Sequence, residues 1–426
     1  MLSKEKRKNI LAILGNIPYN KGGSGDSVDL FYLMKYLSDK YNVRILSLSS
    51  STDIPTDFDF KLINQNVSGE IKYLQDELTV EEKTNEKSIL NRYSILADII
   101  RGNWSFIEKS DLVSDVIYEK VKEISSRNRF DFIYIDQNFL LPKLAYELRE
   151  MAPVLLGIED LHSLNMKRDI KARKGLLNKI IHYRIFKIIE NYEKIWYPKV
   201  HKVATVSIDE AVHLHKVIPK ANNIEVIERG TDTSYFFPNT SNEFPSTLVF
   251  TGTMSWKANS DAIIWFAQKV IPSLIEQKKE FKLYIVGRRP PNRILDLRSP
   301  NIIVTGEVSD VRPYVWSSSI YVAPMISGAG TKTKIFEAMA MGKAIVCTEL
   351  AIEGMKYDVR DCVMIANKPA EYVQAIKELL SNKDKADELG MKARDYIVKY
   401  LSWDIKGPEF CGLVDKIIWE SNSKWL

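Results

Sequence analysis

The feature that most constrains the fold of this chain is an unbroken succession of strand, glycine loop, helix and strand within residues 320–348. An apolar run at 320–323 predicts a buried strand, and a loop with two glycines follows it. Residues 334–341 predict a short helix because their apolar side chains recur on one face. Gly342 is a helix stop signal, and the apolar run at 344–346 predicts the next strand. A βαβ unit of this kind has a right-handed crossover between parallel strands.

The loop and the helix start carry residues suited to binding an anion. Gly328 and Gly330 let the backbone approach a ligand closely, and a helix start presents unpaired N–H groups and the positive end of the helix dipole. Lys332 and Lys334 add positive charge, and the carboxylate of Glu337, one turn on, suits two hydroxyls such as those of a ribose. The pattern fits a nucleotide diphosphate. A solvated loop leading into a tight helix start is the alternative interpretation.

This stretch resembles the donor-site signature of GT-B fold glycosyltransferases of family 4, which are retaining enzymes that use nucleotide-diphosphate sugars. The most similar branch of the family reads G-x-G-T-K-x-K-x-x-E-A-M-A-x-G, and the chain matches it at Gly328, Gly330, Thr331, Lys332, Lys334, Glu337, Ala338, Met339, Ala340 and Gly342. It departs at Ala344, where the family usually has proline, and at Ala329, where the wider family has a first glutamate. The resemblance implies that the matching residues from Gly328 to Glu337 bind the donor.

Composition excludes several other classes of protein. A length of 426 residues with 45% hydrophobic residues predicts about two domains, and a net charge of +5 is too mild to indicate nucleic acid. Three widely separated cysteines argue for a reducing compartment, and the five histidines show no metal-binding spacing. The sequence contains no run of 18 apolar residues, so it predicts no membrane span. We therefore expect a cytoplasmic protein without metal or cofactor, at most peripheral at the inner face of the cell membrane.

The N-terminal segment repeats the same layout. Strands are predicted at 10–15 and 43–48, with a glycine loop and a helix between them, which is typical of a doubly wound α/β domain. The loop resembles the P-x-x-G-G segment that opens family-4 enzymes. This implies that Gly22 contacts the donor and that Gly23 borders the reacting centre. A flexible turn is the alternative interpretation.

A second polar loop follows the strand predicted at 153–158. Asp160 and His162 come just past this strand, where open α/β sheets bind ligands. Family-4 enzymes place a histidine of a matching loop near the reacting sugar, which implies a catalytic role for His162, with Asp160 as the competing residue. The alternative is a helix N-cap made by Asp160 or Ser163, with a satisfied histidine beside it.

Two segments of the first half predict helices at the surface. Residues 66–130 predict one or two helices around the first domain, and residues 165–194 predict one long, basic helix with a broad apolar face. The basic part at 167–187 suits an anionic membrane surface. The width of the apolar face favours instead a helix packed on the sheet, with its basic side in solvent.

The second half offers further residues for the donor. Gly230 and Asp232 resemble the turn at the family's domain crossover, and 239–245 reads as a linker. Gly252 follows the first strand of the second domain; the family usually has an arginine and a lysine after it, but this chain has only Lys257 nearby. The resemblance implies donor contacts by Gly252, Lys257, Arg288 and, through its backbone, Val308.

Together these features predict two Rossmann-like doubly wound α/β domains facing across a cleft, with a C-terminal helix that crosses back to the first domain. The expected segments are 1–238, 239–400 and 401–426. The resemblance implies a retaining hexosyltransferase that moves a sugar from a nucleotide-diphosphate sugar to a hydroxyl of a glycan or lipid-linked acceptor, in bacterial surface polysaccharide or glycoconjugate synthesis. The alternatives are a non-catalytic binding or scaffold subunit and a nucleotide-sugar epimerase on the same fold.

Overall fold

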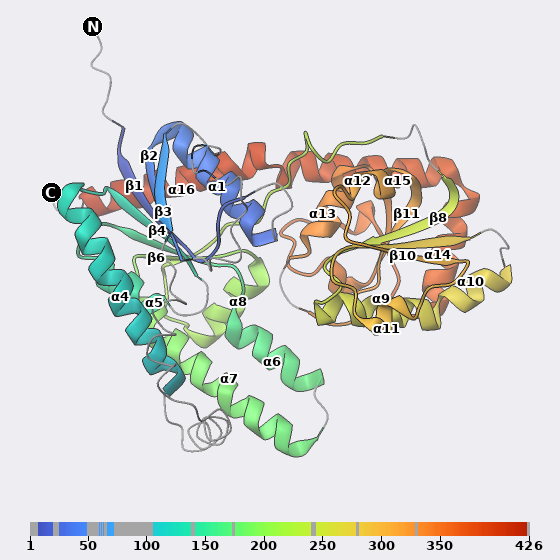
Figure 1. The fold of residues 1–426 in the computed structure, drawn as a ribbon, viewed down its shortest axis with the longest axis horizontal. Helices are drawn as coiled ribbons and strands as arrows, with labels where there is room; N and C mark the ends of the chain where they lie inside the picture. Colours follow the sequence, from blue (N-terminus) through green and yellow to red (C-terminus); the bar gives the residue numbers. More distant parts are fainter. Residues whose placement is uncertain are drawn as a thin grey trace, which may run out of the picture. The chain divides into compact units, whose positions relative to one another are not determined.

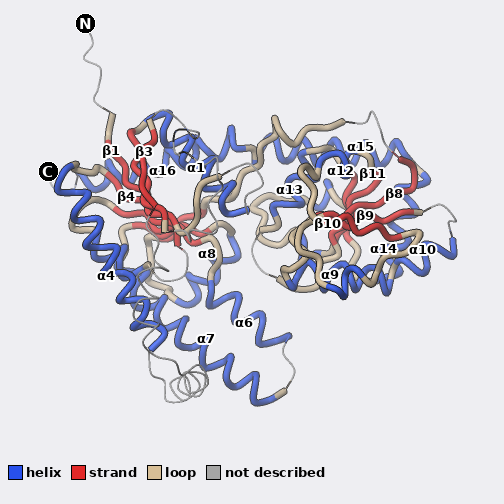
Figure 2. Tube along the Cα trace, viewed as in Figure 1, coloured by secondary structure: helices blue, strands red, loops and turns tan. Residues whose placement is uncertain are grey.

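The chain forms two compact units, each built around one parallel sheet (Figures 1 and 2). The computed structural model describes residues 7–19, 25–48, 59, 61, 63, 66–71, 105–137, 141–172, 175–239, 244–277, 281–328 and 331–423. The first unit comprises Met1–Ile227 and Gly407–Leu426, and the second comprises Glu228–Lys406. None of the described helices has the length and apolar character needed to span a membrane.

The first unit contains a seven-stranded sheet in the order β3-β2-β1-β4-β5-β6-β7, with every described pair parallel. The strands are β1 Asn9–Leu14, β2 Asn42–Ser47, β3 Val67–Ile71, β4 Phe132–Gln137, β5 Val154–Ile158, β6 Lys202–Thr205 and β7 Ile224–Val226. Every residue of β5 is buried, as expected for a central strand covered on both faces. The strand order reverses between β1 and β4, so their carboxyl ends mark the topological switch point.

The helices of the first unit correct two predictions from the sequence. They are α1 Gly25–Lys40, α4 Ser105–Arg127, α5 Pro142–Leu148, α6 His162–Ala172, α7 Leu176–Trp196 and α8 Ile208–Val217. The prediction of one or two helices at 66–130 holds for α4 but is wrong at the start of the segment, because Val67–Ile71 pairs with β2 as an edge strand. A single helix at 165–194 is also wrong: Gly175, with a φ of +88°, separates α6 from α7.

The second unit contains a six-stranded parallel sheet in the order β10-β9-β8-β11-β12-β13. The strands are β8 Phe244–Thr251, β9 Lys282–Val286, β10 Ile302–Gly306, β11 Ser318–Ala323, β12 Ala344–Cys347 and β13 Met364–Ile365. The helices are α9 Lys257–Lys269, α10 Ile271–Gln277, α11 Asn292–Leu295, α12 Arg312–Trp316, α13 Thr333–Ala340, α14 Pro369–Ser381 and α15 Lys383–Tyr396. The strand–loop–helix–strand succession predicted from the sequence is β11, α13 and β12, and the two strands pair in parallel.

Residues 228–238 belong to the second unit. Arg394 donates hydrogen bonds to the carbonyl oxygens of Phe236 and Thr233, at 2.8 and 3.0 Å. Glu228 and Lys406 form an ion pair at 3.0 Å and are both almost fully buried. The units therefore divide at 227/228 and 406/407, whereas the sequence suggested divisions at 238/239 and 400/401.

The last helix, α16 Trp403–Ser423, begins in the second unit and continues into the first. Its part within the first unit packs against α1. Gly407 lies so close to the ring of Tyr36 that a Cβ atom at this position would be only 2.3 Å from the ring. Asp415 pairs with Lys40 and accepts a hydrogen bond from Tyr41. The predicted return of the C-terminal helix to the first domain is confirmed.

Candidate active site

The loops that follow β8 and β9 touch each other through their backbones at the carboxyl edge of the second sheet. The N–H of Gly252 donates to the carbonyl oxygen of Val286 at 3.0 Å. Gly287 has a φ of +150°, and a Cβ atom added there would lie 1.8 Å from the carbonyl oxygen of Gly252. No other residue fits at Gly287 without moving one of the loops, so the contact fixes the position of the β8 loop.

Lys334, in the first turn of α13, reaches this loop. Its Nζ donates to Oδ1 of Asn259 at 2.6 Å and lies 4.2 Å from the centre of the Phe250 ring. Asn259 is itself held by a 3.0 Å hydrogen bond from its Nδ2 to the carbonyl oxygen of Thr253. A Cβ atom on Gly252 would lie 2.8 Å from Asn259 Nδ2 and 3.6 Å from Lys334 Nζ. The structure thus brings together Lys334 and Gly252, two residues singled out from the sequence.

Burial weakens the positive charge of Lys334. The pKa of Lys334 is lowered to about 7, first because burial disfavours the charged amine and then because Lys332 carries a like charge; Glu337 acts in the opposite direction. Among the described residues Lys334 makes no ion pair, and its hydrogen-bond acceptor is a neutral amide. An anion at this point would therefore gain a cation that the protein has not already neutralised.

The start of α13 adds neutral donors to this positive edge. Thr331 Oγ1 is buried and has no hydrogen-bond partner in the part of the chain that the structure describes. The N-cap residue of α13, Lys332, makes no side-chain cap, so the first amides of the helix lack a capping side chain. Gly328, with a φ of +106°, brings the preceding loop to 3.3 Å from Ala258 of α9, measured to the position of an added Cβ atom. Glu337 is half-buried one turn into the helix.

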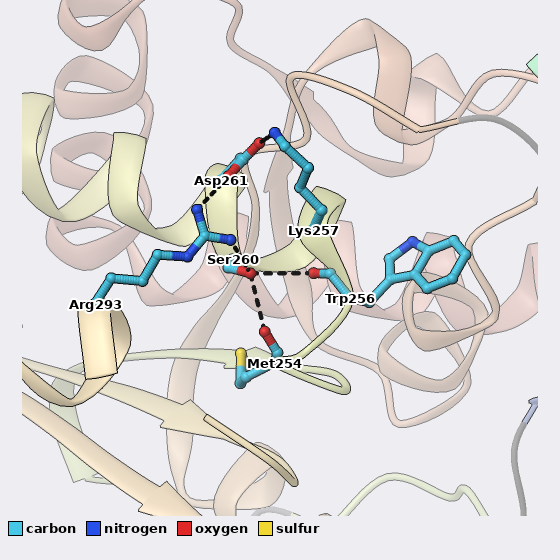
Figure 3. A network of polar contacts seen from close by, with 6 residues as sticks. All are labelled: Met254, Trp256, Lys257, Ser260, Asp261 and Arg293. Carbon is cyan, nitrogen blue, oxygen red and sulfur yellow. Dashed lines mark hydrogen bonds and ion pairs between the residues drawn. The ribbon is translucent and has the colours of Figure 1, made fainter. Parts of the chain in front are cut away.

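The remaining residues predicted to bind the donor lie at several places, and not all of them contact the β8 loop. Arg288 donates through Nε to Thr253 Oγ1 at 3.2 Å, which ties it to the β8 loop. Val308 is partly buried and packs against the core of the second unit. Lys257 is exposed, and its ammonium pairs with Asp261 (Figure 3). Gly22, Gly23 and Gly330 lie outside the described residues.

Figure 3 shows the polar network that contains Lys257 at the start of α9. Asp261 links Lys257 to Arg293, whose NH1 is 2.9 Å from the carboxylate. Ser260 extends the network: it accepts from Arg293 at 2.8 Å and donates to the carbonyl oxygens of Met254 and Trp256. The carboxylate of Asp261 is thus shared between two cations, Lys257 and Arg293.

In the first unit, Asp160 and His162 come just past β5, as the sequence predicted. Asp160 is exposed, whereas His162 is the first residue of α6 and is partly buried. Burial lowers the pKa of His162 to about 4, so the imidazole is neutral at pH 7. A neutral imidazole both donates and accepts hydrogen bonds, which suits a sugar hydroxyl.

The start of α6 is held by carboxylates from other helices. Glu210 of α8 accepts from the N–H of Leu161 at 3.0 Å, and Glu193 of α7 accepts from the N–H of Ser163 at 3.2 Å. The Ser163 hydroxyl also lies 3.3 Å from Nε2 of His213. Burial raises the pKa of Glu193 to about 7. Carboxylates at a helix start complement the helix dipole, so this cluster fixes the loop that carries Asp160.

Comparison with known proteins identifies the second unit. Residues 245–382 match the family described as "Glycosyl transferases group 1". The second unit is a group 1 glycosyltransferase domain. This match covers the whole edge described above, from β8 through the Lys334 loop to α14.

Solved structures similar to this glycosyltransferase share its fold over almost the whole chain. Sucrose-phosphate synthase from Thermosynechococcus elongatus has a TM-score of 0.68 at 14% identity and covers 96% of this chain and 99% of its own. A mutant of S. aureus TarM, in complex with fondaparinux, alpha-GlcNAc-glycerol and UDP, has a TM-score of 0.64 at 12% identity, covering 96% and 99%. HepE of Anabaena in complex with UDP has a TM-score of 0.59 at 12% identity, covering 96% and 100%. The GT-B-like fold class predicted from the sequence is confirmed.

One curated relative is similar in sequence to this glycosyltransferase. It is an uncharacterized 44.6 kDa protein in the cps region of Klebsiella pneumoniae, 20% identical over 287 residues, which is 65% of this chain and 72% of the relative. At this identity the similarity leaves the roles of individual residues open.

Some residues of the candidate site, and of the loop beside it, could not be singled out from the sequence. Asn259 gives one signal: an amide side chain in the first turn of the helix after Gly252. Glu193, Glu210 and His213 give none, because they are distant along the chain from the α6 start that they hold. Only the packing of α7 and α8 against this loop reveals them.

Proposed function

We propose that the protein is a retaining glycosyltransferase that moves a sugar from a nucleotide-diphosphate sugar to a hydroxyl of a glycan or lipid-linked acceptor. The observation that carries the proposal is Lys334, a desolvated lysine without an ion pair among the described residues, beside the start of α13. A diphosphate leaving group develops negative charge during transfer. Preorganised cations and amides at that position stabilise the transition state and need no reorganisation.

Each part of the proposed donor site has a separate task. The contact between Gly252 and Gly287 holds the β8 loop, and Lys334, Lys332 and the Thr331 hydroxyl bind the diphosphate together with Gly328 and the α13 amides. Arg288, tied to the same loop, adds positive charge. The carboxylate of Glu337 accepts hydrogen bonds from the ribose hydroxyls, and the backbone at Val308 contacts the base. Gly22 and Gly330 complete the proposed donor contacts, as the resemblance implies.

The first unit supplies the groups proposed to act on the sugar. His162 is neutral at pH 7, so it orients a sugar hydroxyl without adding charge. Asp160 is exposed and competes for this role, and Gly23 borders the reacting centre by resemblance. Since lysines and a helix start supply the positive charge, the proposed mechanism needs no metal ion.

The relatives support the choice of substrates. The HepE structures contain UDP, UDP with glucose, or UDP-glucose, and the TarM mutant structure contains UDP and alpha-GlcNAc-glycerol. The Klebsiella relative is described by its place in a cps region. We therefore propose uridine donors as the first to test, and synthesis of a bacterial surface polysaccharide or glycoconjugate as the pathway.

Thermal stabilisation by a panel of nucleotides tests the donor site. UDP, GDP, ADP and CMP, with their sugars, are added in EDTA or in magnesium, since a ligand that binds the folded state raises the melting temperature by mass action. We expect one diphosphate to raise Tm equally in both conditions. We expect the shift to disappear in Glu337→Ala. Equal melting temperatures with every nucleotide would instead favour a scaffold subunit. Two departures support that alternative: Ala329 replaces the family's first glutamate, and Thr253 stands where the family usually has the arginine after Gly252.

Product analysis separates transfer from the other chemistry open to this fold. With donor and acceptor present, transfer forms a new glycosidic bond and releases a nucleoside diphosphate. An epimerase converts the donor sugar without any acceptor and keeps the diphosphate bond. A changed donor sugar in the absence of acceptor would overturn the transferase proposal.

A further inference from the structure

The hairpin formed by α6 and α7 exposes large apolar side chains at its tip. The two helices pack against each other and extend away from the sheet of the first unit (Figure 1). At the start of α7, Leu176 is 77% exposed, Leu177 70%, Ile180 47% and Tyr183 52%. The second half of α7 differs, because Phe186 and Tyr192 are buried. Ile195, near the far end of α7, is 39% exposed, so the most exposed apolar side chains of this helix are those at its tip.

The exposed side chains share one face of α7. Leu176, Ile180 and Tyr183 are spaced by four and three residues, so they lie along one side of the helix, with Leu177 at its edge. The sequence favoured an apolar face that packs on the sheet; for the part of this face at 176–183 that interpretation is wrong, whereas Phe186 is buried. In the described part of the chain, the first unit is folded although the side chains at the start of α7 are exposed. Exposed apolar patches of this kind mark interaction surfaces.

Positive charge surrounds the apolar tip. Lys179 and Arg184 are exposed on α7, and Lys167 is exposed on α6. Residues 167–187 contain eight lysines and arginines, against one acidic residue, Asp169. Apolar side chains within a basic rim complement a surface that has an oily interior and negatively charged groups at its boundary.

We propose that this tip, Leu176, Leu177, Ile180 and Tyr183 with Lys167, Lys179 and Arg184, docks the protein on an anionic lipid bilayer. The apolar side chains enter the boundary between head groups and acyl chains, and the basic side chains contact lipid phosphates. This partner is independent of the donor site, because docking needs no residue of the second unit. It would bring the enzyme to acceptors held in a membrane.

Co-sedimentation with vesicles tests the docking surface. Full-length protein is mixed with vesicles of phosphatidylcholine alone, or with about a third phosphatidylglycerol. We expect binding to the anionic vesicles only. We expect Leu176→Ser/Leu177→Ser/Ile180→Ser to weaken this binding by about tenfold or more, since it removes most of the apolar area. Lys179→Gln/Arg184→Gln should weaken it by about fivefold per charge removed.

A matched control removes an exposed apolar side chain elsewhere. Met391 on α15 is 65% exposed, comparable with Leu177, and Met391→Ser should bind anionic vesicles like wild type. Unchanged melting temperatures and unchanged nucleotide-induced shifts would show that each variant is folded. Equal vesicle binding by wild type and the triple serine variant would overturn the proposal. So would a wild-type dimer that becomes a monomer in the triple variant, with no vesicle binding by either form, because the tip would then join two copies.

Discussion

The starts of α6 and α13 both follow the carboxyl end of a parallel strand, but the side chains around them carry opposite charge. The strands are β5 and β11, and each helix begins with amides that lack partners within the helix and with a positive dipole end. At α6, the protein supplies the matching anions, Glu193 and Glu210, which accept from backbone amides. At α13, the side chains are Lys332 and Lys334, which oppose the dipole.

This difference shows which helix start is prepared for a ligand. Burial disfavours charge at both places, so the pKa of Glu193 rises to about 7 and that of Lys334 falls to about 7. The α6 start gains little from an added anion, because its cluster already contains two carboxylates. The α13 start gains an anion's full interaction with the amides and with a lysine that lacks an ion pair among the described residues.

Replacing Lys334 by methionine should produce the largest loss of activity, because it removes the positive charge at the α13 start. Methionine preserves most of the side-chain volume and removes the charge, so we expect kcat/KM for transfer to fall by about a hundredfold or more. Steady-state kinetics with the donor identified by thermal shift measures it. Lys269→Met, at the exposed end of α9, is the matched control and should stay near wild type. Equal activity of Lys334→Met and wild type would break the comparison.

Removing the Glu337 carboxylate should have the next largest effect. We expect Glu337→Ala to lower transfer at least about tenfold, since a carboxylate bonded to two ribose hydroxyls contributes two charge-assisted hydrogen bonds. A donor analogue lacking the ribose hydroxyls separates this role from a structural one. Wild-type protein should lose affinity for that analogue, whereas the variant should bind both nucleotides equally. A folded variant with wild-type turnover would contradict the proposed role.

The pH dependence of donor affinity should show a smaller effect that reports on Lys334 itself. Because the pKa of Lys334 is about 7 in the free protein, most of the amine is neutral at pH 8 and must take up a proton to pair with a diphosphate. We expect Kd to rise about fivefold between pH 7 and pH 8. Lys334→Arg stays charged across this range and should flatten the profile. Calorimetry in buffers of different ionisation enthalpy detects the proton directly.

The sequence predicted the parts of the molecule that depend on local pattern. The β11–α13–β12 unit, the glycine loop and the positions of Lys334 and Glu337 follow from periodicity, helix stop signals and the family resemblance. Where tertiary packing decided, prediction failed: β3 is a short edge strand in a segment that reads as helical, and Gly175 divides what looked like one helix. Val67–Ile71 is a strand because β2 offers it an open edge.

The side chains of the candidate site show the same limit. Lys257 was expected to bind the donor by its nearness to Gly252 in the sequence, but spacing does not reveal that its ammonium pairs with Asp261, a carboxylate that Arg293 also shares. The two carboxylates at the α6 start, Glu193 and Glu210, were missed because they are distant from it in the sequence. They come from α7 and α8, and only the folded chain places them beside Leu161 and Ser163.

The smallest expected effect concerns the stability of the α6 start. The pKa of Glu193 is raised from its ordinary value of 4.5 to about 7, so between these values the folded protein binds more protons than the unfolded chain. Stability from this group is present below pH 4.5 and is lost as pH rises through about 7. Glu193→Gln keeps an acceptor for the Ser163 amide but carries no charge. We expect its Tm at pH 8 to exceed that of wild type by about 2–4 °C, and the difference to vanish near pH 5.

Calorimetry at the two pH values measures this difference, with the exposed Glu150→Gln as the matched control. Since glutamine cannot be deprotonated, the variant should avoid the free-energy cost of a buried carboxylate at high pH and should otherwise resemble wild type. Equal pH dependence in Glu193→Gln and wild type would mean that Glu193 is charged at no cost, because its amide partner and the α6 dipole fully offset burial. The two helix starts would then differ in the sign of their charge but not in whether that charge is satisfied.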